Sequence, residues 1–185
     1  MKKLLKLTGG SFAGRKLYVP ETGVRPATNR TREAIFSTLQ SYFPGGMMGR
    51  SVLDLFAGTG SLGLEALSRG ADRVTFVDSR AESVRAIRRN LDILGFEAEV
   101  VRDDAGCFIK GRDRIDFELI FMDPPYSYRK CGVLVKLLRS RVPADMKVVL
   151  VYERAFQEEL PDFGEGILNL KRKRYGQTEL LYYSI

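Results

Sequence analysis

Asp123 begins the tetrapeptide DPPY, residues 123–126, which follows the apolar run FELIFM. A carboxylate, a rigid turn and an aromatic ring therefore stand together where a strand is predicted to end. Proline has no backbone N–H, so a strand ladder cannot continue through Pro124 and Pro125. Groups of these types can accept hydrogen bonds from an amine and stack on the ring that carries it. The motif is a candidate substrate contact.

A second candidate site is the glycine-rich stretch DLFAGTGSLG, residues 54–63. Its glycines let a chain that leaves a strand turn sharply into a helix and approach a ligand closely. Asp78 follows 20 residues after Gly58, at the end of the next predicted strand. A carboxylate at this place can accept both hydroxyls of a ribose. The loop and its acid predict a nucleoside-binding site in an open α/β sheet.

The nucleoside stays open at this point, because the fingerprint of NAD-binding proteins has the same pattern. Two features favour S-adenosylmethionine (SAM). Asp54 would disfavour a pyrophosphate and suits an ammonium or sulfonium group. Asp104 ends the third strand, where a carboxylate can accept from an adenine amino group while the Ala105 amide donates to the ring. The predicted SAM contacts are Asp54, Phe56, Ala57, Gly58, Gly60, Asp78, Ser79, Asp104 and Ala105.

DPPY resembles the (D/N/S)PP(Y/F) signature of amino-group methyltransferases, which modify exocyclic amines of nucleobases or of glutamine. Such an amine is a poor nucleophile because its lone pair is delocalised. The Asp123 carboxylate and the Pro124 carbonyl, fixed by Pro125, would accept its N–H groups and hold it for in-line attack on a methyl group. Tyr126 would stack on the base. The nitrogen loses its proton only after it becomes cationic, so the absence of histidine is no obstacle.

Composition narrows the class of protein. The chain has 185 residues, 44% of them hydrophobic, which suits one domain with a full core. It has no histidine and two distant cysteines, Cys107 and Cys131, so we expect no metal site. No apolar stretch is long enough for a membrane span and no secretory signal is present, which predicts a cytoplasmic protein. The net charge of +7 permits a polyanionic partner.

Strands alternate with helices after residue 50, which predicts a mostly parallel sheet covered on both faces. We expect a small hairpin over residues 3–19 and a first helix that starts near Thr28–Arg30, with Asn29 or Thr28 as its cap. A closing hairpin with its turn at Tyr175-Gly176 adds antiparallel pairing. The expected strands are 51–56, 73–78, 97–103, 117–123 and 147–153, and the later helices are 61–70, 80–94 and 129–141.

Nearly the whole chain resembles the RsmD family of bacterial 16S rRNA guanine-N2 methyltransferases. The resemblance rests on GGSFAGRKL, RPATNRTREAIF, DLFAGTGSLGLEALSRGA, FVD, NL, DPPY and YGQTEL, which occur in this order. It implies a Rossmann-like class I SAM-dependent methyltransferase fold, with a seven-stranded mostly parallel sheet, a C-terminal antiparallel hairpin and a small N-terminal β-hairpin. It also implies SAM as methyl donor, S-adenosylhomocysteine as product, and guanine N2 of 16S rRNA as acceptor, within the small ribosomal subunit or an assembly intermediate.

Basic residues near aromatic ones predict the RNA-binding surface. The predicted contacts lie on the N-terminal hairpin, at the start of the first helix and in the closing hairpin. They are the basic residues Lys6, Arg15, Lys16, Arg25, Arg30, Arg32 and Arg174, together with Tyr175. The stretch RPATNR, residues 25–30, could instead close over the methionine end of SAM. We expect an N-terminal extension that contacts RNA, residues 1–24, and a methyltransferase domain, residues 25–185.

Other functions stay open on the motifs alone. An amino methyltransferase acting on DNA or protein would share DPPY, and an NAD-binding oxidoreductase would share the glycine loop. A non-catalytic RNA-binding module would share the basic surface. The expected oligomeric state is a monomer, and the sequence does not say which guanine is modified.

Overall fold

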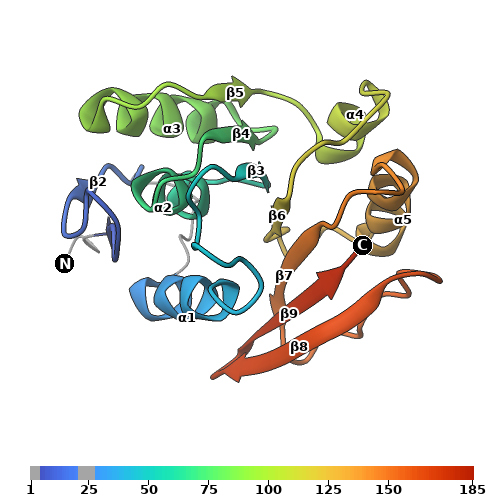
Figure 1. Cartoon of the computed structure of the whole chain (residues 1–185). Coiled ribbons are helices and arrows are strands. Elements are labelled where there is room, and N and C mark those ends of the chain that lie inside the picture. Colours follow the sequence, from blue (N-terminus) through green and yellow to red (C-terminus); the bar gives the residue numbers. More distant parts are fainter. Residues whose placement is uncertain (1–4, 21–27) are drawn as a thin grey trace.

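Seven strands form the central sheet of the protein, whose computed structural model describes residues 5–20 and 28–185. The strand order is β5-β4-β3-β6-β7-β9-β8 (Figure 1). The first five strands of this order are parallel and the last two pair antiparallel, which confirms the predicted fold class. The strands are β3 (Ser51–Leu55), β4 (Arg73–Val77), β5 (Glu99–Val101), β6 (Leu119–Met122), β7 (Val149–Ala155), β8 (Leu168–Tyr175) and β9 (Thr178–Ser184).

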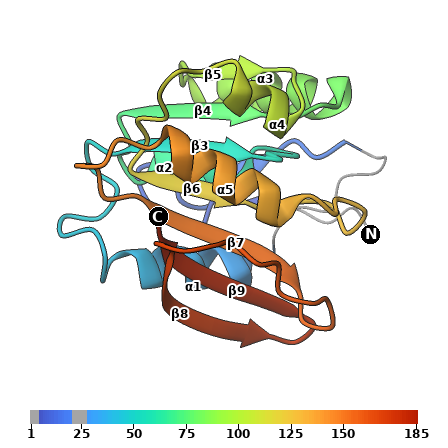
Figure 2. The ribbon, with the colours of Figure 1, turned by 90° about the vertical axis from the view of Figure 1, so that its right-hand side faces the viewer.

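Five helices in the described residues cover the two faces of the sheet, and strand alternation assigns each face its own core. Val52 and Phe121 belong to the core under α1 (Asn29–Leu39), α2 (Ser61–Ser68) and α3 (Ala81–Leu94). Leu53 and Ile120, their neighbours in the chain, belong to the core under α4 (Ala105–Lys110) and α5 (Cys131–Arg141). Figure 2 shows α5 in front of the sheet and α1 and α2 behind it.

The predicted elements are present, with shifts at their ends, and one helix was missed. Thr28 is the residue that caps α1, since its side chain accepts from the Thr31 amide at 3.1 Å. The missed helix is α4, which has 6 residues and is therefore too short to display helical periodicity in the sequence. Its cap is the carboxylate of Asp104, which accepts from the amides of Gly106 and Cys107.

The small N-terminal hairpin consists of β1 (Leu5–Lys6) and β2 (Lys16–Leu17), which pair antiparallel in a sheet of their own. Leu5 and Leu17 are buried in the core shared with α1 and α2. The Ser11 amide donates to the carbonyl of Ser68 at 2.7 Å, at the end of α2. The hairpin is therefore docked on the sheet domain. The predicted boundary at residue 24 lies outside the described residues, so the division of the chain stays a prediction.

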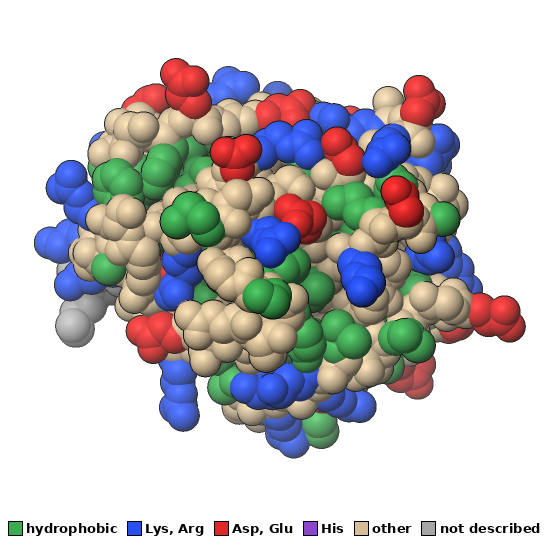
Figure 3. Space-filling model, viewed as in Figure 1, with side chains coloured by type: hydrophobic (Ala, Val, Ile, Leu, Met, Phe, Trp, Pro, Cys, Tyr) green, Lys and Arg blue, Asp and Glu red, His purple; other side chains and the backbone are tan. Residues whose placement is uncertain are grey.

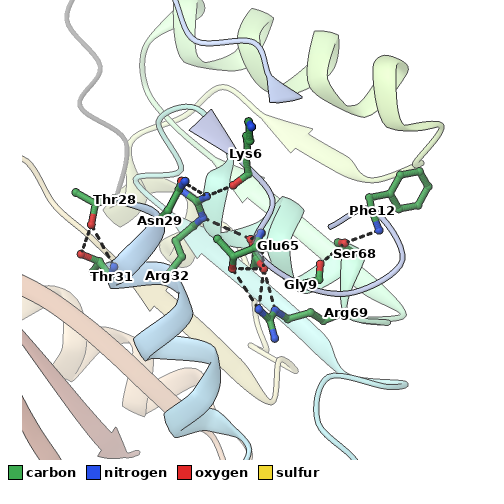
Figure 4. A network of polar contacts seen from close by, with 12 residues as sticks. Lys6, Gly9, Phe12, Thr28, Asn29, Thr31, Arg32, Glu65, Ser68 and Arg69 are labelled. Carbon is green, nitrogen blue, oxygen red and sulfur yellow. Dashed lines mark hydrogen bonds and ion pairs between the residues drawn. The ribbon is translucent and has the colours of Figure 1, made fainter. Parts of the chain in front are cut away.

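A buried ion pair lies under this hairpin (Figure 4). Glu65 of α2 and Arg32 of α1 are both fully buried, with Arg32 Nε 3.5 Å from Glu65 Oε2. Glu65 also accepts from Arg69 Nε at 2.9 Å and from the amide and hydroxyl of Thr8 at 2.9 and 2.7 Å. The Arg32 guanidinium donates in turn to the carbonyl of Lys6. One carboxylate thus joins the hairpin, α1 and α2.

The prediction that Arg32 contacts RNA is wrong in this structure. Its side chain has no exposed surface. Burial lowers the pKa of Arg32, and the facing Glu65 carboxylate opposes that shift. A guanidinium in this position serves the packing of α1 against α2, and a phosphate cannot reach it.

Replacing Glu65→Gln should lower the free energy of unfolding by about 3–5 kcal/mol, because Arg32 would stay buried without its counter-charge. Urea unfolding of the purified protein measures this loss. Glu97→Gln is the matched control, since Glu97 is exposed, and should change the free energy by less than about 0.5 kcal/mol. A loss at position 65 no larger than the control's would show that the ion pair does not hold the hairpin.

Candidate active site

A cavity of about 570 Å³ lies at the carboxyl ends of the parallel strands, within the size range of small-molecule sites. It is lined by the glycine loop, the DPPY motif and the starts of α1 and α4. The predicted catalytic residues Asp123, Pro124, Pro125 and Tyr126 all line it, and so do the predicted cofactor residues Asp54, Phe56, Ala57, Gly58, Asp78, Ser79, Asp104 and Ala105. The structure therefore brings together two motifs that lie far apart in the sequence.

Gly60 is the predicted cofactor residue that does not line this cavity. It is the N-cap of α2 with φ 77°, a left-handed conformation that favours glycine. A β-carbon there would meet Ile87 at 3.0 Å and Phe76 at 3.3 Å, both of them core side chains. Gly60 thus shapes the turn from behind, and its direct contact with the cofactor stays a prediction.

Carboxylates lie in or directly after the carboxyl-terminal halves of four neighbouring strands, in the sheet order β4, β3, β6 and β7. The residues are Asp78 after β4, Asp54 in β3, Asp123 after β6 and Glu153 in β7. Each stands two residues after a side chain of the core under α1, α2 and α3, namely Phe76, Val52, Phe121 and Val151. Because side chains alternate along a strand, all four belong to the same face of the sheet.

Two of these carboxylates hold the glycine loop in place. The Gly58 amide donates to Asp78 Oδ2 at 2.8 Å, and the Gly63 amide donates to Asp54 Oδ2 at 2.9 Å. Phe56, the first residue after β3, has φ 61°. It is the non-glycine residue with positive φ in the described part of the chain, so the backbone is strained at the start of the glycine loop. A β-carbon on Gly63 would lie 2.3 Å from the Phe76 ring, so glycine permits the close approach of α2 to the sheet.

Asp54 is nearly completely buried, and burial raises its pKa to about 7. The Gly63 amide lowers this pKa, while the negative charges of Asp123 and Asp78 raise it further. Near neutral pH the carboxylate is thus poised between its neutral and ionised forms. A cation placed beside it would favour the ionised form.

The DPPY motif lines the cavity beside the glycine loop, because it follows β6, the neighbour of β3 in the sheet. Asp123 and Pro124 are half-buried, whereas the Tyr126 side chain is 61% exposed. Tyr128 packs its ring edge-on against Phe56 with centroids 4.8 Å apart, and its amide donates to the Pro125 carbonyl at 2.8 Å. These contacts connect the DPPY turn with the glycine loop and leave the Tyr126 ring open to a partner from solvent.

Several lining residues were not found from the sequence: Thr28, Thr31, Thr59, Glu153, Arg154 and Thr178. Glu153 and Arg154 of β7 could have been found from the sequence, because the carboxyl ends of parallel strands meet at one edge of the sheet, where ligands bind. Arg154 is buried, and its Nε donates to Glu179 Oε2 at 2.8 Å. Asp104 caps α4 through Oδ1 at 2.9 Å from the Gly106 amide, so part of its carboxylate has a structural role, and its contact with adenine stays a prediction.

Five predicted RNA contacts are exposed: Lys6, Arg15, Lys16, Arg30 and Arg174. Figure 3 shows Lys and Arg side chains over the N-terminal hairpin at the left and over β8 along the lower edge. Tyr175 is half-buried against the core, and the Arg174 guanidinium lies 3.5 Å from the centroid of the Phe156 ring. Arg25 falls outside the described residues.

Neither a membrane helix nor a metal cluster is found in residues 5–20 and 28–185. No helix there is long and apolar enough to cross a bilayer. No three His, Cys, Asp or Glu side chains there are grouped so that they could hold a metal ion.

Comparisons with solved structures agree with this geometry. A protein of Thermus thermophilus, described as hypothetical, has a TM-score of 0.76 at 32% identity, covering 97% of this chain and 98% of its own. A 16S rRNA N2 G1207 methyltransferase of T. thermophilus, solved with AdoMet and guanosine, has a TM-score of 0.66 at 24% identity. The match covers 89% of this chain and 44% of that protein, and it shows a shared fold.

Sequence comparisons identify the family. Ribosomal RNA small subunit methyltransferase D of Escherichia coli K12 is 37% identical over 181 residues, covering 97% of this chain and 89% of the relative. The homologue of the same name in Haemophilus influenzae is 34% identical over 139 residues, covering 72% and 70%. The family model described as "Conserved hypothetical protein 95" matches residues 5–184. The chain therefore belongs to this family, the RsmD family.

Proposed function

We propose that this protein transfers a methyl group from SAM to the exocyclic N2 of a guanine in 16S rRNA. One observation carries the proposal: the nucleoside loop with Asp54 and Asp78 lines the same cavity as the amine-binding motif that starts at Asp123. A donor and an acceptor bound to these two walls would meet within one cavity of about 570 Å³.

The residues of the glycine-loop wall fit SAM. Asp78 is at the end of β4, where a carboxylate can accept from ribose hydroxyls. Its Oδ2 also accepts from the Gly58 amide at 2.8 Å and its Oδ1 from the Arg80 amide at 2.9 Å. Asp54 supplies a buried negative charge for an ammonium or sulfonium group. The buried negative charge of Asp54 would disfavour a pyrophosphate, which argues for SAM over NAD.

The residues of the DPPY wall fit an aromatic amine. SAM, when bound, supplies an electrophilic methyl group on a sulfonium ion. The Asp123 carboxylate and the Pro124 carbonyl would accept the two N–H groups of the amine and direct its lone pair toward the neighbouring strand β3. The exposed Tyr126 ring would stack on the base, worth about 1–3 kcal/mol. Asp123 is also placed to take the proton that the nitrogen releases after it becomes cationic.

The choice of guanine in 16S rRNA rests on the family and on the names of its curated members, which are small-subunit rRNA methyltransferases. The exposed basic residues of the hairpin and of β8 support a polyanionic substrate. We propose the small ribosomal subunit or an assembly intermediate as the natural substrate, the cytoplasm as the compartment, and a monomer as the active form. DNA or protein amines are the alternative acceptors.

The first prediction of the proposed function concerns the product. Purified protein, incubated with labelled SAM and small subunits from a strain that lacks the endogenous enzyme, should place label in 16S rRNA as N2-methylguanine. Mass mapping of nuclease fragments identifies the base and the position. Label in duplex DNA or in protein, with none in guanine N2 of the rRNA, would contradict the proposal.

The second prediction concerns Asp123. Asp123→Ala should reduce kcat by about 10²-fold or more, because the amine loses an acceptor that orients it. The affinity for SAM, measured by calorimetry, should change less than threefold. Asp113→Asn is the control, since Asp113 is exposed and outside the cavity. An Asp123→Ala enzyme with wild-type kcat would remove this residue from the mechanism.

The third prediction concerns the pKa of Asp54, raised to about 7 by burial. A cationic ligand binds the ionised form, so SAM affinity should rise with pH below about 7, by at most about tenfold per pH unit, and level off above it. Asp54→Asn should flatten this profile, whereas Asp72→Asn, at an exposed position, should keep it. Equal slopes for wild type and Asp54→Asn between pH 5.5 and 7.5 would exclude the proposed charge contact.

A further inference from the structure

Glu153 lies beside the amine-binding motif but belongs to none of the predicted motifs. In the parallel pairing of β6 with β7, Met122 is opposite Tyr152. Asp123 and Glu153 are the next residues on the two strands, so their backbones are neighbours. Strands in a sheet lie about 4.8 Å apart. Both residues line the cavity, and both belong to the face of the sheet that α1 and α2 cover.

The position of Glu153 is fixed by its neighbours in the sheet. Strand β7 lies between β6 and β9, and Glu153 is opposite Leu180 of β9. Leu180 is fully buried, and the next residue of β7, Arg154, is tied to Glu179 on the same partner strand. A carboxylate carried by a strand that is paired on both edges has a well-defined backbone position. Such a position suits a group that selects one base over another.

The chemistry of nucleobases gives two adjacent carboxylates a distinct use. Guanine presents the exocyclic N2 amine and the ring N1–H side by side on its Watson–Crick edge, and both are donors. Adenine and cytosine present an exocyclic amine next to a ring nitrogen that carries a lone pair. A carboxylate opposite that ring nitrogen attracts guanine and repels the other two bases. RNA bases are commonly read on this edge once they are unstacked.

We propose that Glu153 determines the specificity for guanine by accepting the N1–H while Asp123 and the Pro124 carbonyl accept the N2 amine. This inference rests on the proposed function, because it assigns a second contact to the base that is methylated. The row of carboxylates then follows the reaction across the sheet. Asp78 and Asp54 face the donor, Asp123 faces the amine, and Glu153 faces the ring of the acceptor.

The test compares two nucleosides as competitors of rRNA methylation. Guanosine has the N1–H, whereas 2-aminopurine riboside keeps the exocyclic amine but has a lone pair at N1. The wild-type protein should be inhibited at least tenfold more strongly by guanosine. In Glu153→Gln the amide can donate to the lone pair, so this preference should fall at least tenfold. Glu159→Gln, at an exposed position outside the cavity, should keep the wild-type ratio.

Calorimetry with SAM checks that each variant is folded, and its affinity should stay within threefold of wild type. A Glu153→Gln variant with the wild-type preference overturns the inference. Guanosine that competes no better than 2-aminopurine riboside with the wild-type protein also overturns it, without any variant. If either of these results is found while the wild-type protein still methylates guanine N2, the role of Glu153 is refuted and the proposed function is not. Wild-type protein that leaves guanine N2 unmethylated refutes the proposed function as well.

Discussion

The hydrogen bonds from two loop amides to Asp54 and Asp78 are the constraint on which the rest of the molecule depends. They fix the turn from β3 into α2, each within 2.9 Å. Once that turn is fixed, α2 carries Glu65 into position to pair with Arg32 and to hold the N-terminal hairpin. The same turn places the glycine loop in the cavity that Asp123 also lines. Fold and site therefore share one set of contacts.

Placing carboxylates in a row on one face of a sheet has an electrostatic cost. The effect is visible at Asp54, whose pKa is raised by burial and by the charges of Asp123 and Asp78. A cationic donor would relieve this repulsion on binding, and a substrate that brings donor groups would relieve it at Asp123 and Glu153. The cavity thus favours a positively charged cofactor together with a base that presents two adjacent donors.

Local patterns in the sequence were sufficient to predict the sheet, the glycine loop and the position of DPPY at the end of a strand, because each of these depends on residue spacing along the chain. Three features needed the structure. Arg32 looked like a surface cation and is buried, because Glu65 arrives from another helix. Helix α4 is too short for periodicity to reveal. Glu153 ends a strand predicted from the sequence, which indicates the edge of the sheet, but its position beside Asp123 follows from the strand register.

A crystal structure of the protein with S-adenosylhomocysteine and guanosine tests the central claim most directly. The account predicts that ribose hydroxyls lie within hydrogen-bond distance of Asp78 and that the amino acid end of the ligand lies over β3 beside Asp54. Guanine N2 should lie against Asp123, with the base on the Tyr126 ring. A ligand bound away from the glycine loop, or a guanine whose N2 points away from DPPY, would contradict the account.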